Sequence, residues 1–217
     1  MAFEVLDEHE QGEVVRKWLR ANAMSIAVGI SIGLLMIFGW QQWKARELRA
    51  QGEAAMQYQA YKDAIEASRD EDATAIAAAL RKDHAKSAYA VFSALRNAEK
   101  AATSNDLATA ATELTWARDA ASDKALKALV TLRLARVTLA QGDADAAIGL
   151  LDAVPKDNYV ASASELRGDA LVKLGRFDEA RSAYQAAADK LEAMSPAHEM
   201  LQMKLADLPA AAEKQNS

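Results

Sequence analysis

Apolar side chains first gather in one uninterrupted run, which extends from Ala21 to Trp43 without a charged residue. A helix rises about 1.5 Å per residue, so this run would form a helix about 35 Å long, and the hydrocarbon core of a bilayer is about 30 Å thick. Tryptophan prefers the membrane interface, and Trp18 and Trp40 lie near the two ends of the run, together with Trp43. The pattern therefore favours a transmembrane helix over residues 21–43 and disfavours the core helix of a soluble protein.

The length and the end of this run distinguish it from a cleaved signal peptide. The apolar part of a signal peptide has about 7–15 residues and is followed by a cleavage site of small residues. This run is longer and leads into Gln41, Gln42 and Lys44 without such a site. We therefore expect an uncleaved anchor in the lipid bilayer, with a tail of residues 1–20 on one side and a domain of residues 44–217 on the other.

Basic residues flank both ends of the run in equal number, as Arg16, Lys17 and Arg20 on one side and Lys44, Arg46 and Arg49 on the other. The excess of positive charge that normally marks the cytoplasmic side is absent, so the charges leave the orientation open. On the near side, one helical face holds the apolar residues Val14, Val15, Trp18 and Leu19. This pattern indicates a short amphipathic helix that lies on the lipid headgroups.

Three small residues lie four positions apart within the run, at Ser25, Gly29 and Gly33. Small residues at this spacing let the backbones of two membrane helices approach closely. The same pattern also arises by chance in single spans. Two interpretations therefore stay open: a surface for packing against another membrane helix, and a plain anchor.

Beyond Lys44 the apolar positions recur with the period of an α-helix. The region 44–68 predicts a helical stalk that continues the span, because Gly52, its one break, costs only about 1 kcal/mol relative to alanine. Two further helices are expected around residues 72–83 and 86–102. Abundant alanine, only three prolines and few β-branched runs outside the span predict an all-α fold.

A pattern of about 33 residues then repeats along the chain. Residues 134–154 align with residues 167–187, so that Gly142 matches Gly175. In both copies a helix ends at the glycine and an alanine follows five positions later. A large apolar residue, Leu151 or Tyr184, comes four positions after that alanine. These features are typical of tetratricopeptide repeats, in which each unit is a pair of helices.

A weaker copy precedes these two, with Asn105 at its turn. Glycine and asparagine tolerate the left-handed conformation that ends a helix, so Asn105, Gly142 and Gly175 are the predicted turn residues. One copy departs from the consensus, because Thr131 and Thr138 occupy the places of a large tryptophan and tyrosine. We expect repeats over residues 86–190 and a capping helix over residues 196–208, which a serine and a proline introduce. The predicted architecture is one transmembrane helix followed by a right-handed, tetratricopeptide-like helical repeat domain.

The first helix of each repeat lines the concave side of such a stack, which is a common binding surface. In this register the groove would be lined by Leu129, Leu132, Arg133, Arg136, Leu139, Asp169 and Val172. The leucines could equally form the core between helices. Arg133 and Arg136 could hold a carboxylate of a partner, or an acidic residue of the chain itself such as Glu165 or Asp169.

Charge and composition narrow the function further. The net charge is −5 and there is no basic stripe, so nucleic-acid binding is not expected. The chain has no cysteine and its three histidines lie in separate segments, so we expect no metal site, no cofactor and no catalytic centre. Acidic pairs such as Asp143 and Asp145 are interpreted as helix caps. No small-molecule substrate is predicted.

Several segments carry a resemblance to a known family: AVGISIGLLMIFGWQQW in the apolar run, residues 126–152 and 165–184 in the repeats, and the ending PAHEMLQMKLADL. They resemble the YfgM-like ancillary subunits of the SecYEG translocon. The resemblance implies a bacterial inner-membrane protein with a cytoplasmic N-terminus and a periplasmic repeat domain. It also implies two partners, the SecYEG translocon and a membrane-anchored periplasmic chaperone similar to prolyl isomerases.

The function that this resemblance implies is that of a non-enzymatic scaffold, which helps newly translocated proteins pass from the channel to periplasmic chaperones. Two other functions stay open. A holdase-type chaperone would bind unfolded clients in the groove of the repeat domain. A negative regulator would sequester a cytoplasmic response regulator through the acidic tail.

Overall fold

The computed structural model describes residues 8–209, with side chains from Gly12 onward, so the first residues of the predicted acidic tail lie outside it. In this part of the chain every regular element is an α-helix, which confirms the all-α prediction. The helices are α1 (Glu8–Glu66), α2 (Asp70–Asp83), α3 (Ala88–Thr103), α4 (Leu107–Ala120), α5 (Lys124–Ala140), α6 (Ala144–Asp152), α7 (Val160–Lys173), α8 (Phe177–Ala188) and α9 (Pro196–Ala206).

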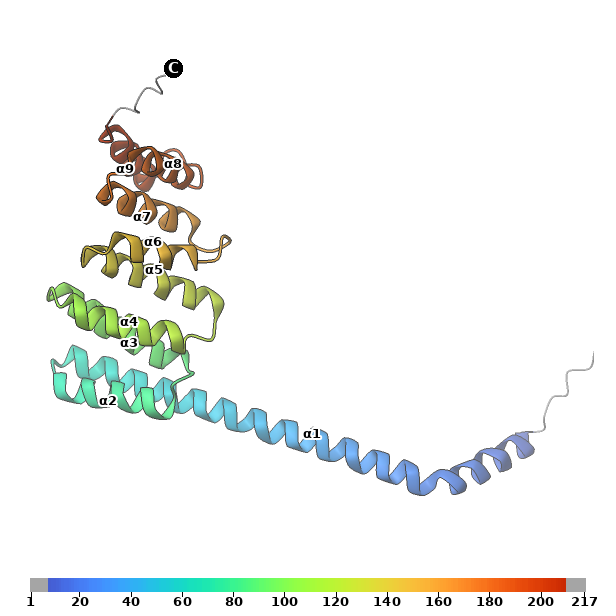
Figure 1. Ribbon diagram of the computed structural model, residues 1–217. Helices are drawn as coiled ribbons and strands as arrows, with labels where there is room; N and C mark the ends of the chain where they lie inside the picture. The colour runs from blue at the N-terminus through green and yellow to red at the C-terminus, as the bar shows by residue number, and fades with distance from the viewer. Residues whose placement is uncertain (1–7, 210–217) are drawn as a thin grey trace, which may run out of the picture. The chain divides into compact units, whose positions relative to one another are not determined.

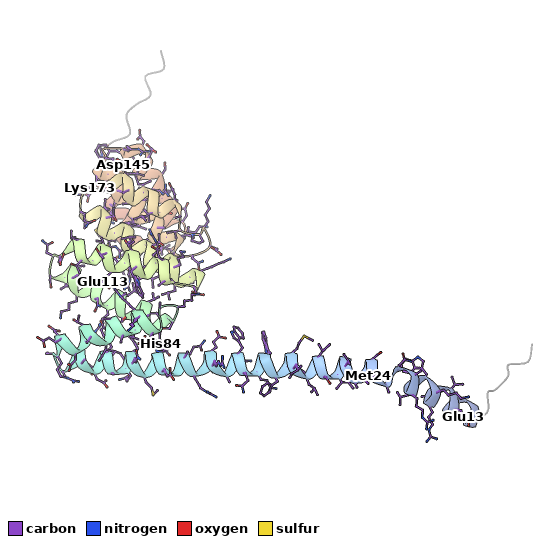
Figure 2. The ribbon with its side chains drawn as sticks, turned by 60° about the horizontal axis from the view of Figure 1, so that its bottom comes forward. Glu13, Met24, His84, Glu113, Asp145 and Lys173 are labelled. Carbon is purple, nitrogen blue, oxygen red and sulfur yellow. The ribbon has the colours of Figure 1, made fainter. Side chains whose placement is uncertain are left out.

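The chain divides into two units, residues 1–52 and residues 53–217, and the division falls inside α1. In the first unit, Figure 2 shows a bend of α1 close to Met24. The side chain of Asn22 donates a hydrogen bond to the carbonyl of Trp18 at 2.9 Å, next to this bend. Such a bond competes with the helical backbone for the same carbonyl, which weakens the regular ladder at this point.

The second unit is a stack of helix hairpins, as Figure 1 shows for α3 to α9. Within the stack, α3 packs on α4, α5 on α6 and α7 on α8, and consecutive hairpins also contact one another. Each hairpin turns at one of the predicted residues: Asn105, Gly142 and Gly175 have φ angles of 62°, 95° and 72°. The left-handed conformation expected from the sequence is therefore present at all three turns.

The same hydrogen bond closes each of these turns. The N–H of the residue after the turn donates to the carbonyl five positions earlier, from Asp106 to Ala101, from Asp143 to Thr138 and from Arg176 to Leu171, at 2.8, 3.2 and 2.9 Å. This bond satisfies a carbonyl that the helix end would otherwise leave unpaired. The three hairpins thus share the same backbone hydrogen bond at the end of their first helix.

A fourth hairpin of the same kind precedes these, in a region where the sequence predicts only a helical stalk and a separate short helix. Ser68 has a φ of 56°, and the N–H of Arg69 donates to the carbonyl of Ala64 at 2.8 Å. Ala73, five positions after Ser68, is buried, as are the residues at the corresponding places further along α2. The last turns of α1 are therefore the first helix of the first hairpin.

One pair of positions fills the interior of every hairpin, and its total volume is kept while the sizes change. The pair lies seven residues before and nine residues after the turn residue, and in chain order it reads Tyr61 with Ala77, Ala98 with Leu114, Ala135 with Leu151, and Gly168 with Tyr184. The first three pairs each lie together in one buried cluster. At the fourth, a Cβ on residue 168 would overlap the ring of Tyr184. The first hairpin reverses the order, with the large residue before the turn.

The final helix α9 covers the end of the stack. Ser195 caps it by accepting a hydrogen bond from the N–H of His198 at 3.2 Å, and Pro196 occupies its first turn. Leu201, which is 1 % exposed, packs against Tyr184 and the adjacent alanines of α8. A terminal helix of this kind shields apolar surface that the last repeat would otherwise expose.

Candidate membrane anchor and partner surfaces

The apolar part of α1 is exposed along its length. Leu35, Met36 and Phe38 have 70 %, 66 % and 62 % of their surface exposed. Contiguous apolar surface of this extent requires a cover, and in the described part of the chain only this helix is long and apolar enough to cross a membrane. At its far end the rings of Trp40 and Trp43 lie 5.4 Å apart. These features indicate a single-pass membrane anchor.

The three small residues of the span lie on this exposed helix. A Cβ built on Gly29 or Gly33 would meet no other atom within 4 Å. No contact within the described chain therefore requires glycine at either position, and the face that they share with Ser25 is free to receive another helix. Helix packing at Ser25, Gly29 and Gly33 stays a prediction.

Of the residues predicted to line a partner groove, Leu132 lies in the core, and Leu139 and Val172 are partly buried against it. Leu132 is 5 % exposed and clusters with Ala135 and Leu166, and Leu139 packs against the same cluster. Val172 is packed between α8 and the residues around α9. The burial of Leu132 favours the alternative interpretation as inter-helix core for that residue, and the groove stays a prediction for Leu139 and Val172. Leu129 remains half-buried.

Asp169 belongs to a polar cluster that ties α9 to the last hairpin. Lys204 on α9 donates to Glu165 at 2.8 Å and to the two carboxylate oxygens of Asp169 at 2.8 and 3.0 Å. The hydroxyl of Tyr184 donates to Asp169 at 2.8 Å. The proposed pairing of Glu165 or Asp169 with Arg133 or Arg136 is therefore wrong, because a lysine about 35 residues further along the chain holds both carboxylates.

This cluster changes the protonation behaviour of its members. Burial alone would lower the pKa of Lys204, but the hydrogen bonds to Asp169 and Glu165 outweigh it and raise the pKa. Burial, and next the hydrogen bond to Asp169, raise the pKa of Tyr184. Lys204 thus remains charged and Tyr184 neutral at physiological pH. These two groups therefore do not make the contact between α9 and the last hairpin pH-dependent in that range.

Arg133 and Arg136 are the predicted groove residues that remain accessible. Both are exposed on α5, and they line a shallow pocket together with Leu95 and Glu99 of α3. Neither arginine forms an ion pair with another described residue. Exposed guanidinium groups of this kind are suited to a carboxylate of a partner protein.

A second polar contact between hairpins was also not visible in the sequence. Tyr61, at the end of α1, is 1 % exposed, and its hydroxyl donates to the side chain of Asn97 at 2.7 Å and approaches the carbonyl of Ser93 at 3.3 Å. Burial raises the pKa of Tyr61 to about 12. The ring of Tyr61 lies 5.9 Å from that of Tyr58, which also contacts Phe92. An aromatic cluster therefore joins α1 to α3.

Among the residues from Gly12 to Pro209, no group of three or more histidine, aspartate or glutamate side chains is arranged to hold a metal ion. What the described surfaces offer is binding: an apolar helix for lipid or another helix, and a repeat domain with accessible arginines.

Comparison with known proteins agrees with this description. The model of the tetratricopeptide repeat-like domain family matches residues 16–210. The chain is 32 % identical over 203 residues to the ancillary SecYEG translocon subunit of Escherichia coli (strain K12). The matched region covers 93 % of this chain and 97 % of that protein. It is 28 % identical over 209 residues to the ancillary SecYEG translocon subunit of Haemophilus influenzae, covering 96 % of this chain and all of that protein. A relative of the same description in Aggregatibacter actinomycetemcomitans is 26 % identical over 212 residues.

Proposed function

Because the chain belongs to the family of ancillary SecYEG translocon subunits with a tetratricopeptide repeat-like domain, we propose that it is a non-enzymatic scaffold of the Sec translocon. The observation that carries this proposal is the construction of α1, which is an exposed apolar span over one part and the first helix of a repeat hairpin over another. A single helix thus belongs both to the candidate membrane span and to the repeat domain.

The proposed topology puts residues 1–20 in the cytoplasm, residues 21–43 in the bacterial inner membrane and residues 44–217 in the periplasm. The absence of cysteine from the sequence allows a direct test, because single cysteines can be introduced without a background. In intact cells with a permeable outer membrane, a membrane-impermeant maleimide should label Gln141→Cys and leave Gln11→Cys unlabelled. Labelling of Gln11→Cys alone would reverse the topology.

The proposed role is to help newly translocated proteins pass from the channel to periplasmic chaperones. The span, with its small-residue face, would contact the SecYEG translocon, and the repeat domain would contact a membrane-anchored chaperone similar to prolyl isomerases. The accessible Arg133 and Arg136 are the best candidates for the second contact, since both are exposed and free of internal ion pairs.

The burial of the predicted groove favours a scaffold over a holdase. A holdase needs exposed apolar surface for unfolded clients, but Leu132 is buried in the repeat domain, and Leu139 and Val172 are partly covered by packing against its core. A scaffold recognises folded partners and can use polar side chains such as the two arginines.

Site-specific photocrosslinking in native membranes tests the proposal. A photoreactive residue at Gly33 should crosslink to a translocon subunit, and one at Leu35, on the opposite face of the helix, should crosslink mainly to lipid. Probes placed at Arg133 and Arg136 should capture a periplasmic chaperone, and Arg136→Glu should abolish that capture in a folded variant. Equal crosslinking from Gly33 and Leu35, or capture that survives Arg136→Glu, would count against the assigned contacts.

A further inference from the structure

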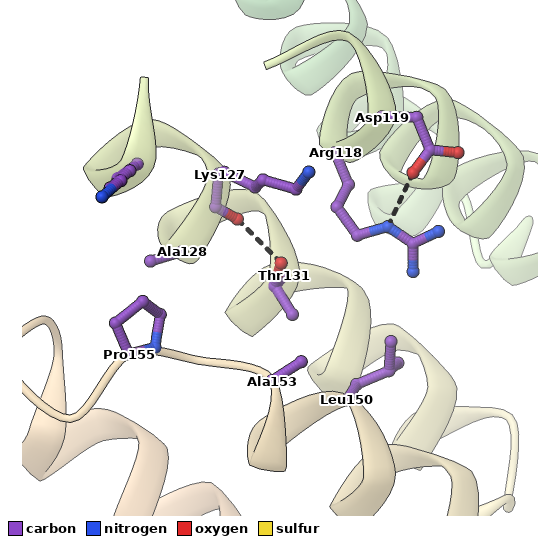
Figure 3. Close-up of a pocket in the computed structure, with 9 residues that line it drawn as sticks. Arg118, Asp119, Lys127, Ala128, Thr131, Leu150, Ala153 and Pro155 are labelled. Atoms are coloured by element: carbon purple, nitrogen blue, oxygen red, sulfur yellow. Dashed lines mark hydrogen bonds and ion pairs between the residues drawn. The ribbon is translucent and has the colours of Figure 1, made fainter. Parts of the chain in front are cut away.

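An open cavity lies in the repeat domain, where α4 ends and α5 begins, and the end of α6 forms its third wall (Figure 3). Its volume is about 360 Å³. This value falls within the range of sites that bind small ligands or side chains, which is about 300–1,000 Å³. Sequence reasoning could not find it, because three separate helices contribute its walls.

The floor of the cavity is apolar. Thr131 lies there, at a position where the repeat pattern normally places a tryptophan, so the smaller side chain leaves space unfilled. Its hydroxyl donates to the carbonyl of Lys127 at 2.8 Å, as Figure 3 shows, and is therefore already bonded. Ala128, Leu150 and Pro155 complete this surface.

Three basic side chains surround the floor: Arg118 from α4, and Lys124 and Lys127 from the first turns of α5. In Figure 3, Lys127 extends in the direction of Arg118, and the guanidinium group of Arg118 is turned toward Asp119. Among the described residues, neither lysine forms an ion pair, and Arg118 uses only its Nε, which donates to the exposed Asp119 at 3.0 Å. An acidic ligand would find charged partners on two walls of the cavity.

The nearby carboxylates offset only part of this positive charge. Asp119 accepts the single bond from Arg118, and Asp123 accepts a hydrogen bond from the N–H of Leu126 at 2.8 Å as the cap of α5. The terminal nitrogens of Arg118 and both lysine ammonium groups therefore remain available in a protein whose net charge is −5.

We propose that this cavity binds an acidic segment of a protein chain. Carboxylates of the segment pair with Arg118, Lys124 and Lys127, and a neighbouring apolar side chain occupies the floor at Thr131. A guanidinium group pairs with a carboxylate in a directed geometry, and the apolar floor adds a requirement that a bare inorganic anion does not meet. This inference does not depend on the proposed translocon role.

The test uses the full chain in non-ionic detergent micelles and two rhodamine-labelled peptides. The acidic probe is Ser-Glu-Leu-Asp-Val-Glu-Ser, and the neutral probe replaces each acid by its amide. Fluorescence anisotropy should show binding of the acidic peptide at least tenfold tighter than that of the neutral one, and the difference should shrink as salt is raised. Equal binding of the two peptides would overturn the proposal.

Variants separate this site from general charge attraction. Lys124→Glu with Lys127→Glu should weaken binding of the acidic peptide at least tenfold. The control Lys86→Glu with Lys190→Glu changes the net charge equally at exposed positions outside the cavity, and it should bind within twofold of the unaltered protein. Binding that survives the first pair, or that both pairs abolish alike, would overturn the proposal.

A third variant tests the cavity rather than its charge. Ala153 is an exposed residue on the wall at the end of α6, so Ala153→Phe should fold and should fill the space above the floor. This variant keeps all three basic residues, and we expect it to bind the acidic peptide at least fivefold more weakly. Unchanged binding would contradict the proposal that an apolar side chain of the peptide occupies the floor of the cavity. Displacement of the peptide by vesicles of phosphatidylglycerol through the same lysines would assign the site to lipid instead.

Discussion

At the scale of single residues, each hairpin depends on one complementary pair, from Tyr61 with Ala77 to Gly168 with Tyr184. Core volume is conserved across the pair while its distribution changes, which is how packed interiors tolerate substitution. Gly168 is the extreme case, since any side chain there meets a tyrosine ring that is 3 % exposed and hydrogen-bonded to Asp169.

We therefore expect Gly168→Ala to destabilise the repeat domain by about 1–3 kcal/mol, as overpacking does elsewhere, despite the higher helix propensity of alanine. Gly149→Ala is the matched control, because residue 149 is an exposed helical glycine with open space around it. It should gain about 0.5–1 kcal/mol. Denaturant unfolding followed by circular dichroism measures both. A stabilised Gly168→Ala would contradict the packing.

Combining Gly168→Ala with Tyr184→Leu recreates the pair found at Ala135 and Leu151. The double variant should be more stable than the sum of the two single losses predicts, because the leucine leaves room for the added methyl group. Strict additivity of the two losses would show that the pair does not couple.

The pKa values of Tyr61, Tyr184 and Lys204 predict a loss of stability in alkali. In the folded chain all three are raised, that of Tyr61 to about 12 from 10.0. Below pH about 10 both states keep these protons, so stability should be level from neutral pH upward. Above it the unfolded chain loses its protons first, and the free energy of unfolding should fall. Urea midpoints measured at a series of pH values test this.

Tyr61→Phe removes one of these groups and should make the alkaline loss shallower, while Tyr159→Phe, at an exposed position, should leave it unchanged. A stability that rises above pH 10 would contradict the assignment.

At the scale of elements, the turns and the capping helix show what the sequence predicts and what it does not. Gly142, Gly175 and Asn105 were recognisable because few residues tolerate a positive φ. Ser68 adopts the same conformation but is not typical of it, and the reversed pair of Tyr61 and Ala77 hides the repeat pattern, so the first hairpin went unnoticed. The repeats over α5 to α8 and the helix α9 were predictable because their signals are local.

The candidate surfaces were less predictable for a different reason. Helical periodicity shows that Leu132 and Val172 lie on an apolar face, but it does not show whether that face lines a groove or meets the next helix. The partner of Asp169 lies on α9, far along the chain, and the basic residues of the open cavity come from two helices. Such groupings follow from tertiary packing rather than from any local pattern.

Docking of α9 should depend on Lys204. Lys204→Met removes the cation that pairs with Glu165 and Asp169, and we expect a loss of about 1.5–3 kcal/mol, the range for hydrogen bonds to charged groups. Hydrogen exchange of residues 196–206 should accelerate more than that of α5. The control Lys190→Met changes an exposed lysine without an ion pair among the described residues, and it should have no effect. Unchanged protection of α9 in Lys204→Met would contradict the role of this lysine.

At the scale of the whole molecule, one helix serves two purposes. Its exposed apolar part is suited to lipid, and its last turns supply Tyr61 to the repeat core. The membrane part carries small residues on two faces, and one of these faces includes both Gly29 and Gly33.

Gly29→Leu with Gly33→Leu should weaken co-purification of membrane partners from mild detergent without preventing membrane insertion, because bulky side chains hold helices apart. Ala27→Leu with Ser31→Leu makes an equivalent change on the opposite face and should have little effect. Alkaline extraction checks insertion in both variants. Unaltered co-purification in the glycine variant would leave the span as an anchor alone.

The sharing of α1 also determines where a protease could release the repeat domain intact. Cleavage between Lys44 and Gly52 would leave all four hairpins complete, since the second unit begins at Glu53. Cleavage further along α1, before Glu66, would remove Ala54 or Tyr61 and uncover the apolar side of α2. Shedding of a stable, soluble fragment is therefore confined to a segment of about two helical turns next to the membrane.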